Sequence, residues 1–227
     1  MKTYIIIGGS KGIGNAIIKT LVPNHKIINL SRNEPDFQHE NLTHHTCDVL
    51  QGSFPEIKQA DGLVYCPGSI NLKPFSSLSE EDFKTDFEIN VLGAVKAIQA
   101  YLPILKQGNK PSIVLFSTVA ASLGMPFHAS IATAKSGVEG LVKSLGAEWA
   151  PNIRINAIAP TITDTSLASK LLRNEKMIEN ITERHPLKKF LNPEEVADMA
   201  AFLISDKTAS ISGQSFEMDC GIVSFKI

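Results

Sequence analysis

Residues 5–14 read Ile-Ile-Ile-Gly-Gly-Ser-Lys-Gly-Ile-Gly, an apolar run that leads directly into a glycine-rich turn. Residues 15–22 follow with a helical pattern, so the stretch predicts a strand, a tight turn and a helix. Glycine tolerates positive φ and has no Cβ, which lets backbone N–H groups approach a bound anion. The new helix adds the positive end of its dipole at the same point. The stretch therefore favours a site for the pyrophosphate of a dinucleotide over an ordinary tight turn.

The overall composition fits a soluble globular protein. The chain has 227 residues, of which 43% are hydrophobic and 20% are charged, and its formal net charge is -1. These values are ordinary for one globular domain, and the small net charge gives no reason to expect nucleic acid or a membrane as a partner. The apolar run at residues 4–7 is too short for a signal peptide or a membrane span.

Cysteine and histidine usage predicts neither disulfides nor a metal site. The three cysteines, Cys47, Cys66 and Cys220, are odd in number and widely spaced, which fits neither a disulfide framework nor a metal-ligand cluster. His44 and His45 are adjacent, and adjacent side chains of an extended segment face opposite ways. We therefore expect a cytoplasmic protein with no bound metal.

Short apolar runs alternate with longer helical patterns along the chain, which predicts a parallel sheet wound by crossover helices. Residues 63–65 and 113–116 are apolar on both faces, as strands covered by helices must be. The strand candidates are Thr3–Ile7, Lys26–Leu30, Thr43–Cys47, Gly62–Cys66, Ser112–Phe116, Arg154–Ile158 and Ser215–Met218. The predicted fold class is α/β: one Rossmann-like, doubly wound parallel sheet of about seven strands with helices on both faces, in a single domain that spans residues 1–227.

The sequence predicts where two helices begin and which face of a third is buried. Ser79 is followed by three acidic residues, and Asn192 is followed by a proline and then glutamates, so both are predicted to cap helices. Between Ile131 and Trp149, apolar residues recur at spacings of three and four, which predicts one buried stripe on a long helix.

The spacing of the glycines identifies a family. Gly8, Gly12 and Gly14 form a G-x-x-x-G-x-G arrangement, whereas the general dinucleotide fingerprint is G-x-G-x-x-G. This variant resembles the short-chain dehydrogenase/reductase family, and further matches extend over the whole length. The resemblance implies a nicotinamide dinucleotide, oxidoreductase activity on a small-molecule substrate, and a homodimer or homotetramer.

The second predicted strand indicates which dinucleotide binds. A carboxylate at the end of this strand would bond both adenosine ribose hydroxyls and repel a 2′-phosphate. The chain has Ser31 and Arg32 there, with no acid. Arg32 has a planar donor fork that suits phosphate, and Lys11 in the glycine turn adds a second positive charge. The sequence therefore favours NADP(H) over NAD(H).

The resemblance implies a set of cofactor contacts along the chain. Asp48 matches the family acid that holds the adenine edge, although a turn residue at a strand end is the alternative. The complete set is Gly8, Ser10, Lys11, Gly12, Ile13, Gly14, Ser31, Arg32, Asp48, Val49, Pro67, Gly68, Asn90, Lys135, Pro160, Thr163 and Thr165.

Catalytic positions also match in part. Asn90 corresponds to the helix asparagine of the family's proton relay, and Lys135 to the lysine that bonds the nicotinamide ribose. Thr118 replaces the substrate-orienting serine and keeps its hydroxyl.

Three departures from the family pattern concern the chemistry. The family tyrosine lies four residues before the lysine, and Ile131 occupies that position before Lys135. Residues 65–68 read Tyr-Cys-Pro-Gly in place of Asn-Asn-Ala-Gly, and Thr161 replaces the glycine after Pro160. A phenol beside a lysine supplies the proton when a carbonyl is reduced, a contribution of about 10²–10⁴-fold. Isoleucine supplies none of it.

Several substitutes for the phenol are open. Histidine is a side chain that commonly serves as a general acid, so His128 is one candidate, although the alternative is an ordinary loop histidine. Lys135 has a proton to donate directly or through water, and Thr118 can hydrogen-bond the oxygen. An iminium substrate needs no acid at the hydride step.

Residues 159–192 match the family's substrate lid, and their apolar side chains predict a mostly apolar pocket wall. The predicted function is an NADP(H)-dependent oxidoreductase that transfers a hydride between NADPH and a small carbonyl-type substrate, with a non-standard proton donor. The alternative is an NADPH-binding protein with little or no turnover, such as a redox sensor or a subunit of an assembly.

Overall fold

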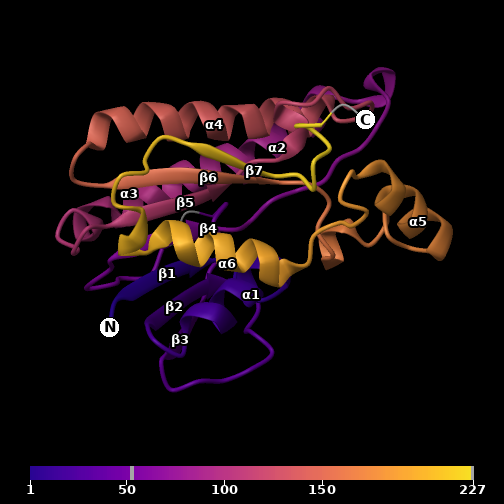
Figure 1. The fold of residues 1–227 in the computed structure, drawn as a ribbon. Coiled ribbons are helices and arrows are strands. Elements are labelled where there is room, and N and C mark those ends of the chain that lie inside the picture. Colours follow the sequence, from indigo (N-terminus) through magenta and orange to yellow (C-terminus); the bar gives the residue numbers. More distant parts are fainter. Residues whose placement is uncertain (52–53, 226–227) are drawn as a thin grey trace.

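The computed structural model describes residues 1–51 and 54–225, and its centre is a parallel sheet (Figure 1). The seven strands among these residues lie in the order β3-β2-β1-β4-β5-β6-β7, and every pairing is parallel. The strands are β1 (Thr3–Ile7), β2 (Lys26–Ser31), β3 (Leu42–Thr46), β4 (Gly62–Tyr65), β5 (Ser112–Phe116), β6 (Arg154–Pro160) and β7 (Ser215–Met218). The predicted doubly wound α/β fold in one domain is confirmed.

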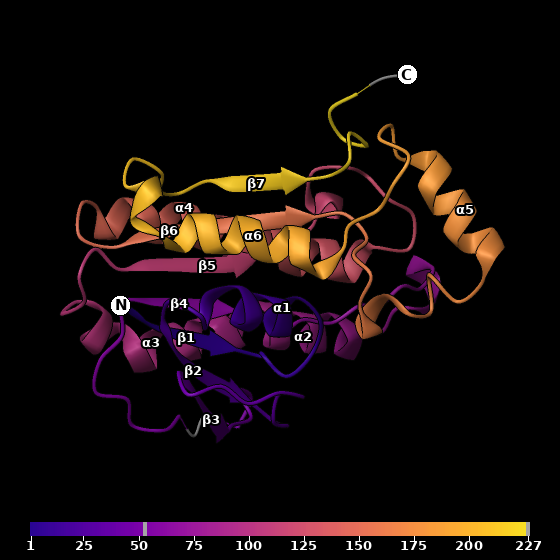
Figure 2. The same cartoon turned by 60° about the horizontal axis from the view of Figure 1, so that its bottom comes forward.

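Helices cover both faces of this sheet. The helices are α1 (Gly12–Leu21), α2 (Glu80–Phe87), α3 (Gly93–Leu105), α4 (Ala129–Trp149), α5 (Glu175–Arg184) and α6 (Pro193–Ile204). Figures 1 and 2 show α1 and α6 against one face and α3 and α4 against the other. Helix α5 stands apart from both layers, beyond the carboxyl ends of the strands, where parallel sheets place their ligands.

The two-sided burial explains why the strands read as continuous apolar runs. Side chains of a strand alternate between faces, so Tyr4 and Ile6 pack with α1 and α6, whereas Ile5 and Ile7 pack with α3 and α4. All four are at most 1% exposed, and burial of one such side chain contributes about 1.5–3 kcal/mol.

Some strand ends differ from the predicted ends, in each case by one or two residues. β2 extends to Ser31, β4 ends at Tyr65, and β6 continues to Pro160 because β7 remains paired with it there. β3 lies one residue earlier than predicted, since Leu42 pairs with Ile27. Helix α1 begins at Gly12, within the glycine turn, rather than after the turn.

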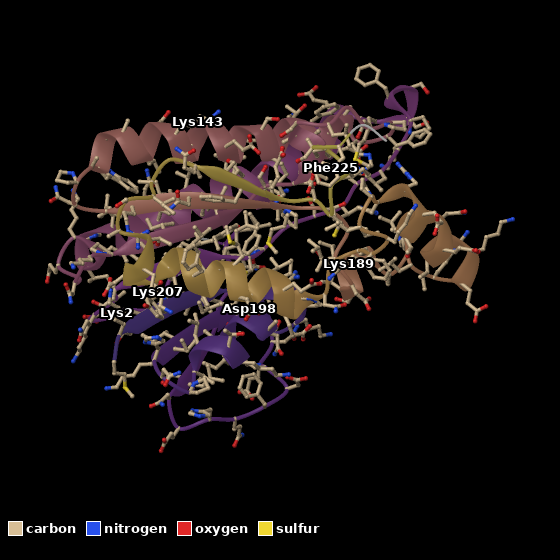
Figure 3. All side chains as sticks on the ribbon, in the orientation of Figure 1. Lys2, Lys143, Lys189, Asp198, Lys207 and Phe225 are labelled. Carbon is tan, nitrogen blue, oxygen red and sulfur yellow. The ribbon has the colours of Figure 1, made fainter. Side chains whose placement is uncertain are left out.

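The predicted helix starts are confirmed at both caps. Ser79 and Asn192 each form a capping box, in which the N3 carboxylates of Asp82 and Glu195 accept from the cap backbone. Figure 3 shows charged side chains projecting outward from both helix layers, such as Lys143 on α4 and Asp198 on α6. Among the described helices, none combines the length and apolar character needed to cross a bilayer.

The glycine turn brings the start of α1 directly against the end of β1. Gly8 and Gly12 have positive φ values of 81° and 55°, which L side chains rarely adopt. A Cβ on Gly14 would lie only 2.4 Å from the Gly8 carbonyl oxygen. A residue larger than glycine at position 14 would therefore push the helix away from the turn.

Gly14→Ala is expected to lower the free energy of unfolding by about 1–3 kcal/mol, because its methyl group would meet backbone. Gly140→Ala in α4 is the matched control, since no atom of the described residues lies within 4 Å of that Cβ position. The control should gain about 0.5–1 kcal/mol from helix propensity. Urea denaturation followed by circular dichroism measures both variants, and wild-type stability of Gly14→Ala would contradict the close approach.

Candidate active site

Two cavities adjoin at the carboxyl ends of the strands. The first, here called the turn cavity, has a volume of about 430 Å³ and is lined by the glycine turn and by the ends of β2 and β3. The second, called the lid cavity, has a volume of about 300 Å³ and lies between α4 and the segment that precedes α6. Both are lined by Ile13, Cys66, Gly68, Thr165 and Leu167. A long ligand can therefore extend from one cavity into the other.

The turn cavity has the features of an anion site. It lies at the N-terminus of α1, where no side chain caps the first backbone N–H groups, and such groups are free to bind a ligand. Lys11 and Arg32 line the cavity, are exposed, and form no ion pair with any described residue. The predicted contacts that line it are Gly8, Ser10, Lys11, Gly12, Ile13, Gly14, Ser31, Arg32, Asp48, Val49, Pro67, Gly68 and Thr165.

Two polar residues of the turn cavity also hold its loops. The Ser31 hydroxyl donates to the Asn33 carbonyl at 2.8 Å and accepts from the Asn29 amide at 2.9 Å. The Asp48 carboxylate accepts from the Leu50 backbone N–H at 3.0 Å, which is the turn role considered as its alternative. Ser31 and Asp48 thus shape the cavity wall as well as lining it.

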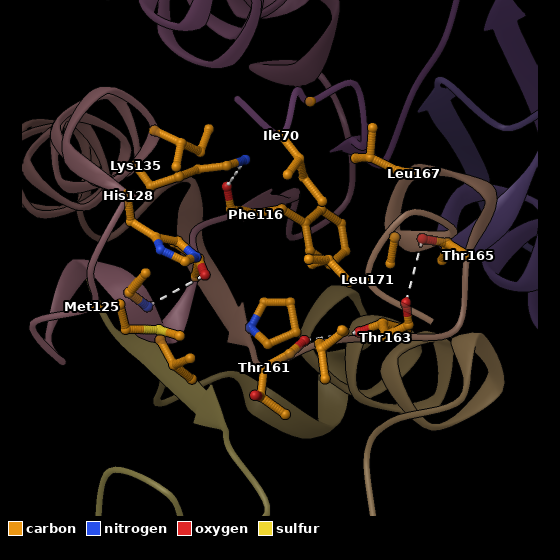
Figure 4. Close-up of a pocket in the computed structure, with 18 of the residues that line it drawn as sticks. Ile70, Phe116, Met125, His128, Lys135, Thr161, Thr163, Thr165, Leu167 and Leu171 are labelled. Carbon is orange, nitrogen blue, oxygen red and sulfur yellow. Dashed lines mark hydrogen bonds between the residues drawn. The ribbon is translucent and has the colours of Figure 1, made fainter. Parts of the chain in front are cut away.

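The lid cavity is mostly apolar. Figure 4 shows Ile70, Phe116, Met125, Leu167 and Leu171 around it. The predicted residues that line it are Thr118, His128, Ile131, Lys135, Pro160 and Thr163, together with the shared Ile13, Gly68 and Thr165.

Lys135 is the buried cation of this cavity. Its side chain projects from α4, its Nζ donates to the Phe116 carbonyl at 2.8 Å, and the residue is 8% exposed. Burial lowers the pKa of Lys135 to about 8, against the opposing influence of Cys66 and Asp86. An ammonium with this pKa is charged at neutral pH but releases its proton far more readily than a surface lysine.

Asn90 lies behind the cavity wall and lines neither cavity in the described structure. It sits in a π-helical turn, Glu88–Leu92, and its Nδ2 donates to the Ser69 hydroxyl at 2.9 Å and to the Asp86 carbonyl at 2.7 Å. Its Oδ1 is buried with no partner among the described residues. A Cβ on Gly68 would lie 3.3 Å from this oxygen and 3.6 Å from Lys135 Nζ. Asn90 Oδ1 and Lys135 Nζ therefore lie near the same point beside Gly68, where a larger residue would come between them.

Asp86 completes this network, and sequence reasoning missed it. Its buried carboxylate accepts from Ser69 at 2.5 Å and from Ser130 at 2.6 Å, which ties α2 to α4 and to the loop after β4. Its position four residues before Asn90, on the same side of a helix, was the available signal.

The remaining predicted donors differ in how they are held. Thr118 Oγ1 accepts from the Ala120 backbone N–H at 3.3 Å, so its hydrogen remains available to a ligand. His128 Nδ1 lies 2.7 Å from the Pro126 carbonyl and therefore carries a hydrogen. His128 is also the N-cap residue of α4, where the helix dipole disfavours a positive charge.

No phenol of this chain replaces the one missing at Ile131. Ile131 is 5% exposed and lines the lid cavity. The three tyrosines, Tyr4, Tyr65 and Tyr101, are at most 3% exposed and pack in the two core clusters. None of them lines either cavity in the described part of the chain.

Comparisons with known proteins identify the family. A family model described as enoyl-(acyl carrier protein) reductase matches residues 36–223. The 3-oxoacyl-(acyl-carrier-protein) reductase FabG of Thermotoga maritima is 36% identical over 177 residues, which cover 78% of this chain and 71% of the relative. The chain belongs to the short-chain dehydrogenase/reductase family.

Two further comparisons support this assignment over the full length. Carbonyl reductase (NADPH) 2 of Sus scrofa is 26% identical over 230 residues, which cover 96% of this chain and 94% of the relative. The crystal structure of a short chain dehydrogenase family protein from Francisella tularensis superposes with a TM-score of 0.91 at 25% identity, covering 99% of this chain and 100% of that one.

In this short-chain dehydrogenase/reductase, the depressed pKa of Lys135 predicts a pH-dependent stability. The pKa is about 8 in the folded protein and 10.5 in the unfolded chain, so the folded state binds fewer protons between these values and becomes more stable as the pH rises through them. Burial of the charged amine lowers the free energy of unfolding by about 3 kcal/mol at a pH below both values. Lys135→Met has no amine to titrate. The free energy of unfolding of the wild type, measured relative to this variant, should therefore rise by about 2–3 kcal/mol between about pH 7 and pH 10.

Chemical denaturation at the two pH values measures this difference. Lys143→Met is the control, because Lys143 is an exposed lysine of the same helix. The same pH dependence in wild type and in Lys135→Met would contradict the lowered pKa.

Proposed function

We propose that this protein is an NADP(H)-dependent oxidoreductase that transfers a hydride between NADPH and a small carbonyl-type substrate, with Lys135 as the proton donor in place of a tyrosine. The observation that carries the proposal is the pair of adjoining cavities. Unpaired cations lie at one of them, and the buried ammonium of Lys135 lies in the other. The porcine relative is named carbonyl reductase (NADPH) 2, and this name supports the same cofactor here.

The turn cavity fits a phosphorylated dinucleotide. The uncapped N-terminus of α1 suits the pyrophosphate, and Arg32 and Lys11 suit a 2′-phosphate. No acid stands at the end of β2, where a carboxylate would repel that phosphate. By the same proposal, Asp48 and Val49 hold the adenine, and Lys135, Thr163 and Thr165 hold the nicotinamide half.

The bound cofactor would supply a hydride to the substrate carbonyl carbon. The protein must then orient the carbonyl oxygen and protonate it. The Thr118 hydroxyl donates a hydrogen bond to this oxygen, and Lys135 Nζ transfers the proton. The pKa of about 8 at Lys135 suits this step, because a general acid works best when its pKa lies near the working pH.

The structure favours Lys135 over the other candidates. His128 would have to carry its second proton at the N-terminus of α4, where the helix dipole opposes that charge. Thr118 is too weak an acid to donate a proton alone. The unpartnered Oδ1 of Asn90 and Lys135 Nζ both lie beside Gly68, and we propose that this oxygen accepts a hydrogen bond from the group that reprotonates Lys135.

The segment 159–192 is proposed as the substrate lid. It contains α5, which stands apart from the sheet layers (Figure 2), and several of its apolar side chains line the lid cavity. Closure of such a segment excludes water from the reacting centre. A cytoplasmic location and a homo-oligomeric state remain expectations drawn from the sequence and the family resemblance.

Ile131 favours a second candidate function, a protein that binds NADPH with little turnover. The side chain is buried and apolar where the family has its acid. Tight NADPH binding without consumption of NADPH in the presence of ketones, diketones, quinones or imines would support this alternative and contradict the catalytic proposal.

Arg32→Ala is expected to weaken NADPH binding by about tenfold or more, because it removes a charge-assisted hydrogen bond to phosphate. NADH binding should change little. Quenching of protein fluorescence by each dinucleotide measures both affinities. Arg173→Ala is the control, since Arg173 is an exposed arginine that lines neither cavity. Equal loss of NADPH and NADH affinity in Arg32→Ala would contradict a phosphate contact.

Ile131→Tyr is expected to raise kcat/KM for ketone reduction, because it restores a phenol next to Lys135. The gain should be smaller than the roughly 10²–10⁴-fold of a general acid against none, since Lys135 already donates the proton in our proposal. Initial rates of NADPH consumption measure the change, and Ile131→Phe controls for the added ring without the acid. If Ile131→Phe gains as much as Ile131→Tyr, the proton-donor argument is wrong.

A further inference from the structure

The ionisable side chains that line the lid cavity are nearly all basic. Apart from the Cys66 thiol, those among its described lining residues are Lys135, His128, Arg184 and His185. Each of these four carries a positive charge or gains one on protonation, and no aspartate or glutamate is among the described lining residues. A cavity of this kind has a positive potential. It therefore disfavours a cationic substrate such as an iminium.

Arg184 is the exposed cation at one edge of this cavity. It is the last residue of α5 and forms no ion pair with any described residue. Its basic neighbours are already engaged, since Lys188 pairs with Glu183 at 3.0 Å and Lys189 pairs with Glu195. Of the three basic residues Arg184, Lys188 and Lys189, only Arg184 lines the cavity, and it has no acidic partner among the described residues.

His185 and Thr161 form a second polar group on the cavity wall. His185 is 4% exposed, and its Nδ1 donates to the Ile181 carbonyl at 2.7 Å. Its Nε2 lies 2.8 Å from Thr161 Oγ1, so the neutral ring accepts a hydrogen bond from the threonine. The Thr161 hydroxyl can turn its hydrogen from the ring to a ligand in the cavity. An anion beside the pair favours that arrangement.

The end of α5 does not oppose an anion strongly. Its last carbonyl groups carry the negative end of the helix dipole, but the Thr182 carbonyl accepts from the His185 backbone N–H and the Glu183 carbonyl accepts from Lys188 Nζ. The Ile181 carbonyl accepts from the His185 ring.

We propose that Arg184 and the Thr161–His185 pair bind the carboxylate of an oxo-acid substrate. The reducible carbonyl lies at Lys135 and Thr118, and an apolar chain spans the distance between the two ends. Figure 4 shows Lys135 and Thr161 on different walls of the cavity, with the apolar side chains of Phe116 and Met125 on either side. This inference rests on the proposed reductase function and defines its substrate class.

A comparison of oxo acids with their methyl esters tests the proposal. The probes are ω-1 oxo acids of about six to ten carbons and the matching esters, which differ only in charge. Wild type should prefer the acid by about tenfold or more in kcat/KM at the best chain length, because the ester lacks the charge-assisted contacts. Arg184→Gln should bring the acid-to-ester ratio close to one, and Thr161→Val should lower it, whereas Thr161→Ser retains it.

Arg173→Gln is the matched control, since this exposed lid arginine lies outside both cavities, and it should keep the wild-type ratio. Calorimetric titration of the NADP⁺-loaded protein with hexanoate and with methyl hexanoate gives a binding readout that needs no turnover. Equal rates and affinities for acid and ester in wild type, or an unchanged ratio in Arg184→Gln, would overturn the proposal while leaving the reductase function intact. Loss of NADPH binding, by contrast, would overturn the proposed function itself.

Discussion

The hydrogen bond from Lys135 Nζ to the Phe116 carbonyl is the contact on which the candidate active site depends. It joins α4 to the end of β5 and holds a positive charge at the wall of the lid cavity. Because the amine is buried, its charge is poorly solvated, and its pKa falls to about 8. The same burial that costs stability thus makes the ammonium easier to deprotonate near neutral pH, as our proposal for a proton donor requires.

Replacement of the family tyrosine by Ile131 changes the surroundings of this amine. A phenol would give the lysine a polar neighbour, whereas isoleucine adds apolar surface to a cavity that already has several apolar walls. An apolar neighbour disfavours the charged form of an amine. This environment is the physical basis of our proposal that Lys135 donates the proton in place of the missing phenol.

Much of the fold follows from local sequence patterns. The apolar runs, the glycine turn and the caps at Ser79 and Asn192 are short-range features, and each acts within a few residues. The strand ends could not be predicted to the residue, because they depend on pairing with distant strands, as Pro160 does with Met218. The single-domain doubly wound sheet needed no such detail, since the alternation of strands and helices limits the topology.

The candidate site was less predictable than the fold. Family resemblance placed most contact residues on the two cavity walls, but the site roles remain proposals. Asp86 and the contact between Thr161 and His185 were missed, because each depends on a partner far away in sequence. The position of Asn90, beside Gly68, likewise depends on a π-helical turn that no local pattern indicates.

The pH dependence of single-turnover NADPH oxidation tests the central claim most directly. With a saturating ketone or oxo acid, our account predicts that the rate falls as the pH rises through the lysine pKa of about 8, because the ammonium is the proton source. Lys135→Met should lack this phase, and His128→Ala should keep it. A rate that stays constant well above this pH, or a phase that vanishes in His128→Ala, would contradict the account.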